Sequence, residues 1–292
     1  GNEAESMYKN TKLWTAINDI AAMIHKEDPN HPVTTALAGA NVKNISLIVS
    51  MAPELDFLCV NSYYPNPMDI ASNLASAGWD KPWMITEYGQ KGTWMNVPKT
   101  SFGTLVEETS TEKAVSYREI YENAVLANRN NGCLGSFAFV WGYQNHGEVL
   151  TWYGLFDKDG NSFAAVDELQ YFWAGKYPEM RAPVIADRNA MLMNGKKADD
   201  SVMVSADSEN KASVRASSPC GSPLKYRWMI YREGTSSPDG SIPDGMSGLF
   251  ADDTLPDVVF RAPSAAGNYR LCVFVTDENH KAASAVIPFC VK

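Results

Sequence analysis

The stretch that decides the fold is KPWMITEYGQKGTW, residues 81–94, in which an apolar run ends on a carboxylate. Trp83 to Thr86 are apolar or β-branched, which is typical of a strand buried on both faces. The run stops at Glu87, and Gly89 then frees the backbone to turn. A surface acid needs no apolar lead-in, so the pattern predicts an acid held at the end of a buried strand.

Helical and strand patterns alternate around this stretch, from residue 1 to about 177. Apolar runs typical of strands occupy 31–39, 55–65, 81–94 and 133–144. Helical periodicity occupies 8–28, 41–53, 69–78, 111–132 and 163–175. Buried strands that alternate with helices indicate a parallel sheet covered by helices. The sequence therefore predicts an α/β domain over residues 1–177.

The pattern changes after residues 175–183, where strict alternation replaces helical spacing. Two sets of alternate apolar residues each share one strand face: Leu224, Tyr226, Trp228 and Ile230, then Tyr269, Leu271, Val273 and Val275. Such strands, separated by turn-rich segments, predict an all-β immunoglobulin-like sandwich over 183–292. Cys272 faces the opposite side, so no central disulfide between the sheets is expected. The sequence leaves open whether Cys220 and Cys290 pair.

Composition narrows the class of protein. The chain has 292 residues, 45% of them hydrophobic, and a formal net charge of −9. A negative charge argues against a nucleic-acid or anionic-membrane partner, because either needs clustered Lys and Arg. The sequence has no apolar run of about 18 residues, so we predict no membrane span. The five cysteines have no zinc-like spacing.

Four short motifs resemble, in order, the catalytic blocks of retaining glycoside hydrolases of the (β/α)8 superfamily. They are GNE at 1–3, VNSYY at 60–64, ITEYG at 85–89 and FVWGY at 139–143. The likeness covers residues 1 to about 175 and is closest to family 2, the β-glucuronidase and β-galactosidase type. It implies the C-terminal half of a TIM barrel, strands 5–8, with the active site at the carboxyl ends of the strands.

The resemblance also implies catalytic roles. Glu87 would be the nucleophile, Glu3 the general acid/base, and Tyr63 a hydrogen-bond donor to the nucleophile. Retaining hydrolysis needs two carboxyl groups about 5–5.5 Å apart, one ionised to attack and one protonated to assist the leaving group. The resemblance implies no cofactor and no metal.

Further residues are expected to contact substrate. The resemblance implies that Asn2 binds the sugar 2-hydroxyl and that Trp141 forms the floor of a sugar subsite, although core packing is an alternative for Trp141. The remaining candidates are Asn61, Tyr88 and Trp94, and, after the last strand, Gln144, Asn145, His146 and Glu148. For Trp94, packing in the core or at the rim is an equal alternative.

The sequence departs from the family where the first half of the barrel would precede Asn2. We expect a partner chain, a longer parent chain or self-association to cover the open sheet. Without a preceding strand, Glu3 is expected to lack a fixed position opposite Glu87, so the chain alone is expected to be nearly inactive. We also expect a secreted, periplasmic or cell-surface location, although the sequence shows no signal peptide.

The expected function is hydrolysis of β-glycosidic O-linkages in oligo- or polysaccharides. A non-catalytic carbohydrate-binding protein on a degraded barrel is an alternative, and binding without turnover of aryl β-glycosides would distinguish it. A transglycosidase that uses the same two glutamates is another alternative, which product analysis with an acceptor sugar would reveal.

Overall fold

The structure is a computed structural model that describes residues 1–7, 10–143, 151–234 and 245–292. The chain divides into two compact units. The first contains Gly1–Lys91 and Ser116–Phe139, and the second contains Gly92–Val115 and Val140–Lys292. Within the described ranges, no helix combines the length and the hydropathy that a bilayer crossing needs.

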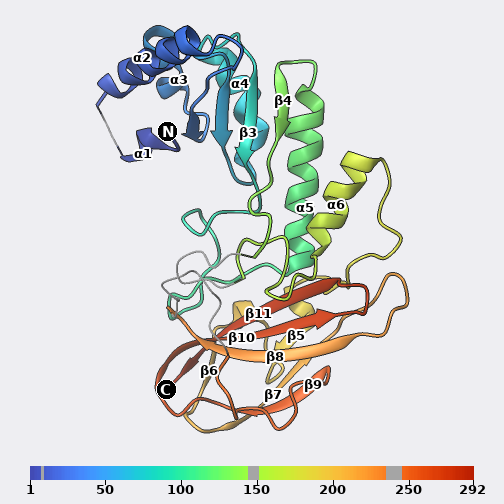
Figure 1. Cartoon of the computed structure of the whole chain (residues 1–292). Helices are drawn as coiled ribbons and strands as arrows, with labels where there is room; N and C mark the ends of the chain where they lie inside the picture. Colours follow the sequence, from blue (N-terminus) through green and yellow to red (C-terminus); the bar gives the residue numbers. More distant parts are fainter. Residues whose placement is uncertain (8–9, 144–150, 235–244) are drawn as a thin grey trace. The chain divides into compact units, whose positions relative to one another are not determined.

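The first unit is built on a parallel sheet of four strands in sequence order (Figure 1). The strands are β1 (Ala36–Ala38), β2 (Leu58–Asn61), β3 (Trp83–Glu87) and β4 (Cys133–Ser136). Each pairs in parallel with the next. Asn2 extends the sheet by one parallel bridge to Ala36. The predicted parallel sheet is confirmed, and each strand lies inside its predicted run.

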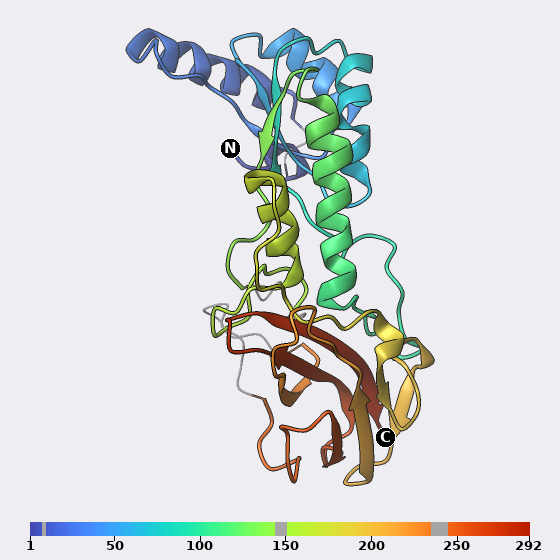
Figure 2. The same ribbon diagram turned by 90° about the vertical axis from the view of Figure 1, so that its right-hand side faces the viewer.

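Helices connect these strands, as the alternating pattern predicts. The α-helices that precede β3 are α1 (Ala4–Met7), α2 (Lys12–Glu27), α3 (Val42–Met51) and α4 (Ile70–Ser76). Figure 2 shows α3 and α4 next to one another at the side of the sheet. The Asn41 side chain caps α3 by accepting a hydrogen bond from the Asn44 amide at 3.2 Å.

The helix α5 (Ser110–Ile120) starts one residue before the predicted range. Its first turn carries a capping box, in which the Thr109 hydroxyl accepts from the Glu112 amide and the Glu112 carboxylate accepts from the Thr109 amide. After Ile120 the helix continues as the π turn Tyr121–Val125 and the 3₁₀ turn Leu126–Asn128. The single predicted helix over 111–132 is therefore three consecutive helical segments.

The sheet register positions the candidate site. Asn61 at the end of β2 pairs with Glu87 at the end of β3, after a register shift between Val60 and Asn61. The Ser62 amide donates to the Glu87 carbonyl at 2.8 Å, and the Tyr64 amide donates to the Gly89 carbonyl at 2.9 Å. The carboxyl ends of two neighbouring strands therefore carry the polar side chains to one edge of the sheet.

The second unit contains two β-sheets. One has the order β6 (Val202–Val204), β11 (Ala282–Val291), β10 (Gly267–Thr276) and β8 (Lys225–Arg232). The other has the order β5 (Met191–Met193), β7 (Glu209–Val214) and β9 (Asp257–Arg261). Residues from both sheets share one apolar core. The predicted alternation is confirmed, because both sets of apolar residues on β8 and β10 contribute to this core.

All five cysteines lie in the described ranges and are free thiols. Cys272 is buried on the face of β10 opposite the main core, next to Met229, Tyr231 and Val286. Burial raises the pKa of the Cys272 thiol well above its usual range. Cys220 and Cys290, whose pairing the sequence left open, therefore form no disulfide with one another.

The second unit includes more of the chain than residues 183–292. The Thr109 hydroxyl donates to the Ile185 carbonyl at 3.0 Å, and the Ser284 amide donates to the Ser110 hydroxyl at 2.9 Å. The helix α6 (Ala164–Ala174) also belongs to this unit. Independent folding of 183–292 stays a prediction, because residues 92–115 and 140–182 form one compact unit with the sandwich.

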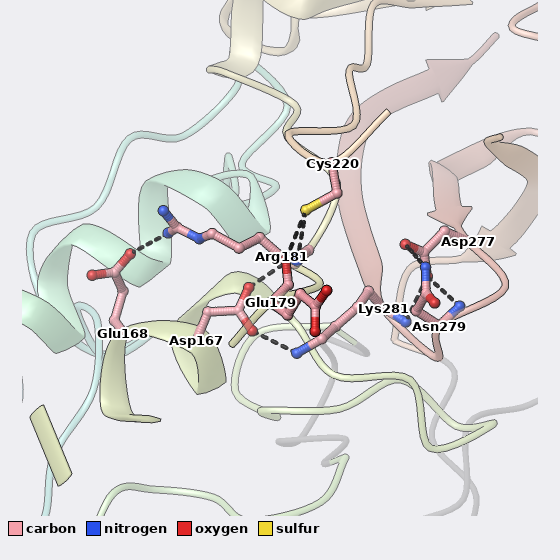
Figure 3. A network of polar contacts seen from close by, with 9 residues as sticks. Asp167, Glu168, Glu179, Arg181, Cys220, Asp277, Asn279 and Lys281 are labelled. Carbon is pink, nitrogen blue, oxygen red and sulfur yellow. Dashed lines mark hydrogen bonds and ion pairs between the residues drawn. The ribbon is translucent and has the colours of Figure 1, made fainter. Parts of the chain in front are cut away.

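Two buried carboxylates attach α6 to the rest of the second unit (Figure 3). Asp167 accepts from Lys281 Nζ at 2.6 Å and from the Ala182 amide at 2.7 Å. Glu168 accepts from Arg181 Nη2 at 3.0 Å and from the Tyr177 hydroxyl at 2.9 Å. The acids are only 1% and 3% exposed, so their charges need these partners.

Candidate active site

Glu87 lies at the carboxyl end of β3 with one carboxylate oxygen held by a neighbouring strand end. The Tyr63 hydroxyl donates to Glu87 Oε2 at 2.8 Å. Tyr63 is buried, and its ring packs edge-on against Phe139 with centroids 6.0 Å apart. Because packing restrains the ring, the phenol is a fixed donor to the carboxylate.

Glu3 is fixed to the edge of the same sheet through its backbone. The Glu3 amide donates to the Ala36 carbonyl at 2.8 Å, and the Ala36 amide donates to the Gly1 carbonyl at 3.2 Å. The Thr35 hydroxyl adds a bond to the Gly1 carbonyl at 3.0 Å. The first residues thus behave as one more short strand, which differs from the expectation that Glu3 lacks a fixed position.

The backbone of Glu3 has φ of +49°, in the left-handed region that non-glycine residues seldom adopt. This conformation turns the chain from the bridge at Asn2 into α1 within one residue. Left-handed non-glycine residues cost on the order of 1 kcal/mol and are found preferentially at functional sites. The strained turn therefore separates the sheet-bonded residues 1–3 from the helix that follows.

Asn61 joins the two ends of the site through its side-chain amide. Its Nδ2 donates to Asn2 Oδ1 at 3.0 Å and to Glu3 Oε1 at 2.9 Å. Its Oδ1 accepts from the Thr86 hydroxyl at 2.7 Å. Asn61 is 4% exposed, whereas Glu3 is partly buried and Asn2 is exposed. Its expected contact with substrate stays a prediction.

The electrostatics link the two glutamates. Burial is the main cause that raises the pKa of Glu87 above its usual value, and the charge of Glu3 raises it further. The hydrogen bond from Tyr63 acts in the opposite direction, because it stabilises the anion. Glu3 and Glu87 therefore lie within electrostatic range of one another.

In each glutamate, one carboxyl oxygen accepts a hydrogen bond from a neighbouring side chain, and the second oxygen differs in this respect. Glu87 Oε2 is held by Tyr63, and Glu3 Oε1 is held by Asn61. Within the described ranges, no protein group donates to Glu87 Oε1 or to Glu3 Oε2. Two carboxyl oxygens are thus available to a ligand at the same edge of the sheet.

The other predicted substrate residues lie in different surroundings. Tyr88 is fully buried and packs against Tyr117, so we do not include it in the proposed substrate site. Trp94 and Trp141 belong to the second unit. Both are 62% exposed, Trp94 beside Tyr153 and Trp141 edge-on against Phe156. Residues 144–150, with their four candidates, lie outside the described residues.

Sequence reasoning missed the role of Thr86. Its hydroxyl contacts Asn61, and the only signal in the sequence is a hydroxyl inside an otherwise apolar strand. A buried polar group needs a partner, so such a residue indicates a polar neighbour on an adjacent strand. The sequence does not say which neighbour. Elsewhere, the described residues include no group of three or more His, Cys, Asp or Glu arranged to hold a metal ion.

No family model matches the sequence, and no curated protein matches it. The chain is similar to several solved structures at low identity. A nucleoside hydrolase-related hypothetical protein from Saccharophagus degradans, associated with carbohydrate metabolism, is 15% identical over 94% of this chain and 74% of that chain, with a TM-score of 0.34.

Two further similar structures are glycoside hydrolases. A GH39 β-xylosidase from Caulobacter crescentus is 13% identical over 75% of this chain, with a TM-score of 0.40. A family 2 member from Bacteroides cellulosilyticus is 12% identical over 99% of this chain, with a TM-score of 0.39. The chain spans about half the length, 48%, of each of them. Likenesses of this strength assign neither a family nor an activity.

Proposed function

We propose that Glu3 and Glu87 form the catalytic pair of a retaining β-glycoside hydrolase that acts on oligo- or polysaccharides. One observation carries the proposal. Two electrostatically linked carboxyl groups lie at one sheet edge, one bound by a buried phenol, and each has an oxygen that no donor from the described part of the chain contacts. Paired carboxyl groups of this kind suit acid-assisted displacement at an anomeric carbon.

In the first step, Glu87 Oε1 attacks the anomeric carbon while the bond to the leaving oxygen breaks. Glu3 gives its proton to that oxygen, so the leaving group departs as an alcohol. The Tyr63 hydrogen bond restrains Glu87 through the other oxygen, Oε2. The product of this step is a covalent glycosyl ester on Glu87.

In the second step, Glu3 acts as a base. It takes a proton from water, the water oxygen attacks the anomeric carbon, and Glu87 leaves as a carboxylate. Two displacements restore the original anomeric configuration. The charge of Glu3 raises the pKa of Glu87, so the two carboxyl groups do not ionise independently.

We further propose that the first unit corresponds to the C-terminal half of a family 2-type (β/α)8 barrel, and that an immunoglobulin-like sandwich follows it. Support for the first comes from parallel strands in sequence order that end in the polar residues. Support for the second comes from two sheets around one core, with a Tyr269 hydroxyl that donates to the Ala265 carbonyl at 2.8 Å. That bond resembles a tyrosine corner. Self-association and an extracellular or periplasmic location stay predictions.

The test uses two substitutions of Glu87 and an aryl β-glycoside with an activated leaving group. Glu87→Gln should lower turnover by several orders of magnitude, because covalent catalysis is lost. Azide should rescue Glu87→Ala and give a glycosyl azide of inverted configuration. Near wild-type turnover by Glu87→Gln would refute the proposal. Glycan binding without turnover would favour a binding protein, and sugar transfer to an acceptor would favour a transglycosidase.

A further inference from the structure

We propose that Asn61 is a positioning residue that selects which oxygen of Glu3 carries the catalytic proton, and that Thr86 fixes the orientation of the Asn61 amide. This inference rests on the proposed function, because it assigns Glu3 the acid/base role. It gives Asn61 an action through Glu3 in addition to its expected substrate contact.

The orientation of the Asn61 amide follows from its three partners. A primary amide offers two N–H donors on nitrogen and an acceptor on oxygen. Glu3 Oε1 and Asn2 Oδ1 are acceptors, and both lie next to Nδ2. Thr86 carries a hydroxyl that donates to Oδ1 at 2.7 Å. A rotated amide would bring its oxygen against two acceptors, so the observed orientation satisfies all three contacts at once.

This orientation determines where Glu3 holds its proton. A protonated carboxyl group has one carbonyl oxygen, which is the better acceptor, and one hydroxyl oxygen, which donates. Because an N–H of Asn61 points at Oε1, that oxygen takes the carbonyl role. The proton then lies on Oε2, the oxygen without a protein donor within the described ranges. Asn61 thus directs the proton toward the oxygen that a glycoside can reach.

Burial gives this arrangement its strength. Asn61 is 4% exposed, so water replaces a lost partner poorly and an unsatisfied group costs about 1–3 kcal/mol. The Glu3 backbone is separately held by its bond to Ala36. Loss of the Asn61 amide should therefore leave the main chain of Glu3 in place while its carboxyl group rotates freely. The expected defect is in proton delivery rather than in binding of the chain to the sheet.

The test compares two glycosides of the same sugar. A dinitrophenyl glycoside has a leaving group that needs little protonation, whereas an alkyl glycoside needs the general acid, whose contribution is typically about 10²–10⁴-fold. Asn61→Ala should lower kcat/KM for the alkyl glycoside at least about 10-fold more than for the dinitrophenyl glycoside. A residue with a purely structural role would lower both equally.

Thr86→Val provides a second variant that keeps the side-chain shape and the Asn61 amide. It should lower kcat/KM for the alkyl glycoside about 3–10-fold more than for the dinitrophenyl glycoside. The effect is smaller than that of Asn61→Ala because the amide loses only the bond that fixes its orientation. Thr34→Val is the matched control. Thr34 is, like Thr86, a partly buried threonine, but its hydroxyl donates to the Phe57 carbonyl at 2.8 Å. For Thr34→Val, the ratio of the two kcat/KM values should equal that of wild type.

The outcomes separate this inference from the function on which it rests. If Glu87→Gln leaves turnover of the dinitrophenyl glycoside unchanged, or if wild type lacks turnover both alone and within a longer parent chain, the proposed function and this inference fall together. If Glu87→Gln abolishes turnover while Asn61→Ala and Thr86→Val keep the wild-type ratio, this inference alone is overturned. Should Asn61→Ala fail to fold, the ratio measured for Thr86→Val decides.

Discussion

The Tyr63 hydroxyl lies 2.8 Å from Glu87 Oε2 and donates a hydrogen bond to it. Glu87 ends β3, and Tyr63 follows the end of the neighbouring parallel strand β2 by two residues, so the sheet brings the two side chains together. A donor aimed at a carboxylate stabilises the anion and restrains its rotation. Both effects support a nucleophile.

Tyr63→Phe should therefore lower kcat on an aryl β-glycoside by about 10²-fold, the usual scale for one positioned catalytic hydrogen bond. The fold should persist, because the ring and its contact with Phe139 remain. Steady-state kinetics and a melting curve test the two parts. Tyr64→Phe is the control. If Tyr64→Phe proves damaging and Tyr63→Phe silent, the neighbouring tyrosine holds the nucleophile.

The raised pKa of Glu87 predicts the acid side of the pH–rate profile. Burial is the first cause of the shift, so the nucleophile should lose its charge as pH falls through a value above the usual 4.5. Tyr63→Phe removes a group that lowers the pKa, and the acid limb should therefore move to higher pH. A limb that moves to lower pH in this variant would contradict the assigned role of the phenol.

The same shift predicts how stability changes with pH. A raised folded-state pKa means that the protonated acid is favoured by folding, a contribution present below 4.5 and lost as pH rises through the folded-state value. Glu87→Gln should thus be more stable than wild type at neutral pH, with a smaller difference at pH 4. Urea unfolding at both pH values measures this. If the gain in stability of Glu87→Gln over wild type were smaller at neutral pH than at pH 4, burial would not be raising the pKa of Glu87.

The ion pair between Asp167 and Lys281 predicts a non-additive stability effect. Asp167 is 1% exposed, and its Oδ1 lies 2.6 Å from Lys281 Nζ. Lys281→Met should cost about 3–5 kcal/mol, because a buried charge loses its partner. Asp167→Asn combined with Lys281→Met should recover much of that loss. A double-mutant cycle by urea unfolding checks it, and additive losses would show that the pair is not coupled.

The sequence was sufficient to predict the strand ends but not the side-chain network. A continuous apolar run makes β3 and the position of Glu87 predictable, and parallel order then brings β2 beside it. The contact of Asn61 with Glu3 joins residues 58 apart, and no local pattern encodes it. The helical spacing of apolar residues made α5 predictable. The same spacing does not reveal where an α-helix changes to a π turn, so the change after Ile120 was not predicted.

Local sequence patterns also could not predict which residues belong to the second unit. Ser110 and Ser284 form a hydrogen bond across 174 residues, so only the tertiary structure shows that 92–115 accompany the sandwich. Similarly, helical spacing of apolar residues gives way to strand-like alternation near 175–183. Such a change of secondary structure need not coincide with the limits of a hydrophobic core. Trp94 and Trp141, expected beside the two glutamates, belong to this second unit.

The buried guanidinium of Arg270 depends on residues outside 183–292. Arg270 is 2% exposed, and its Nε donates to Glu233 Oε2 at 2.6 Å. Its Nη2 donates to the Leu105 carbonyl at 3.0 Å, and its Nη1 lies 3.5 Å from Glu107 Oε2. Two of these partners precede the sandwich in sequence. Arg270 therefore reports whether 183–292 form a complete folding unit.

Arg270→Met should have different effects in the whole chain and in a 183–292 fragment. In the whole chain it leaves Glu107, 1% exposed, without one of its cations, so we expect a loss of about 3–5 kcal/mol. The fragment lacks Glu107 and Leu105, which opens the guanidinium to water and leaves only the pair with Glu233, worth about 0.2–1 kcal/mol when exposed. Urea unfolding of both forms, each with and without the substitution, measures the difference. Equal losses would mean that the contacts to 105–107 contribute nothing, and a fragment without a cooperative transition would refute independent folding of 183–292.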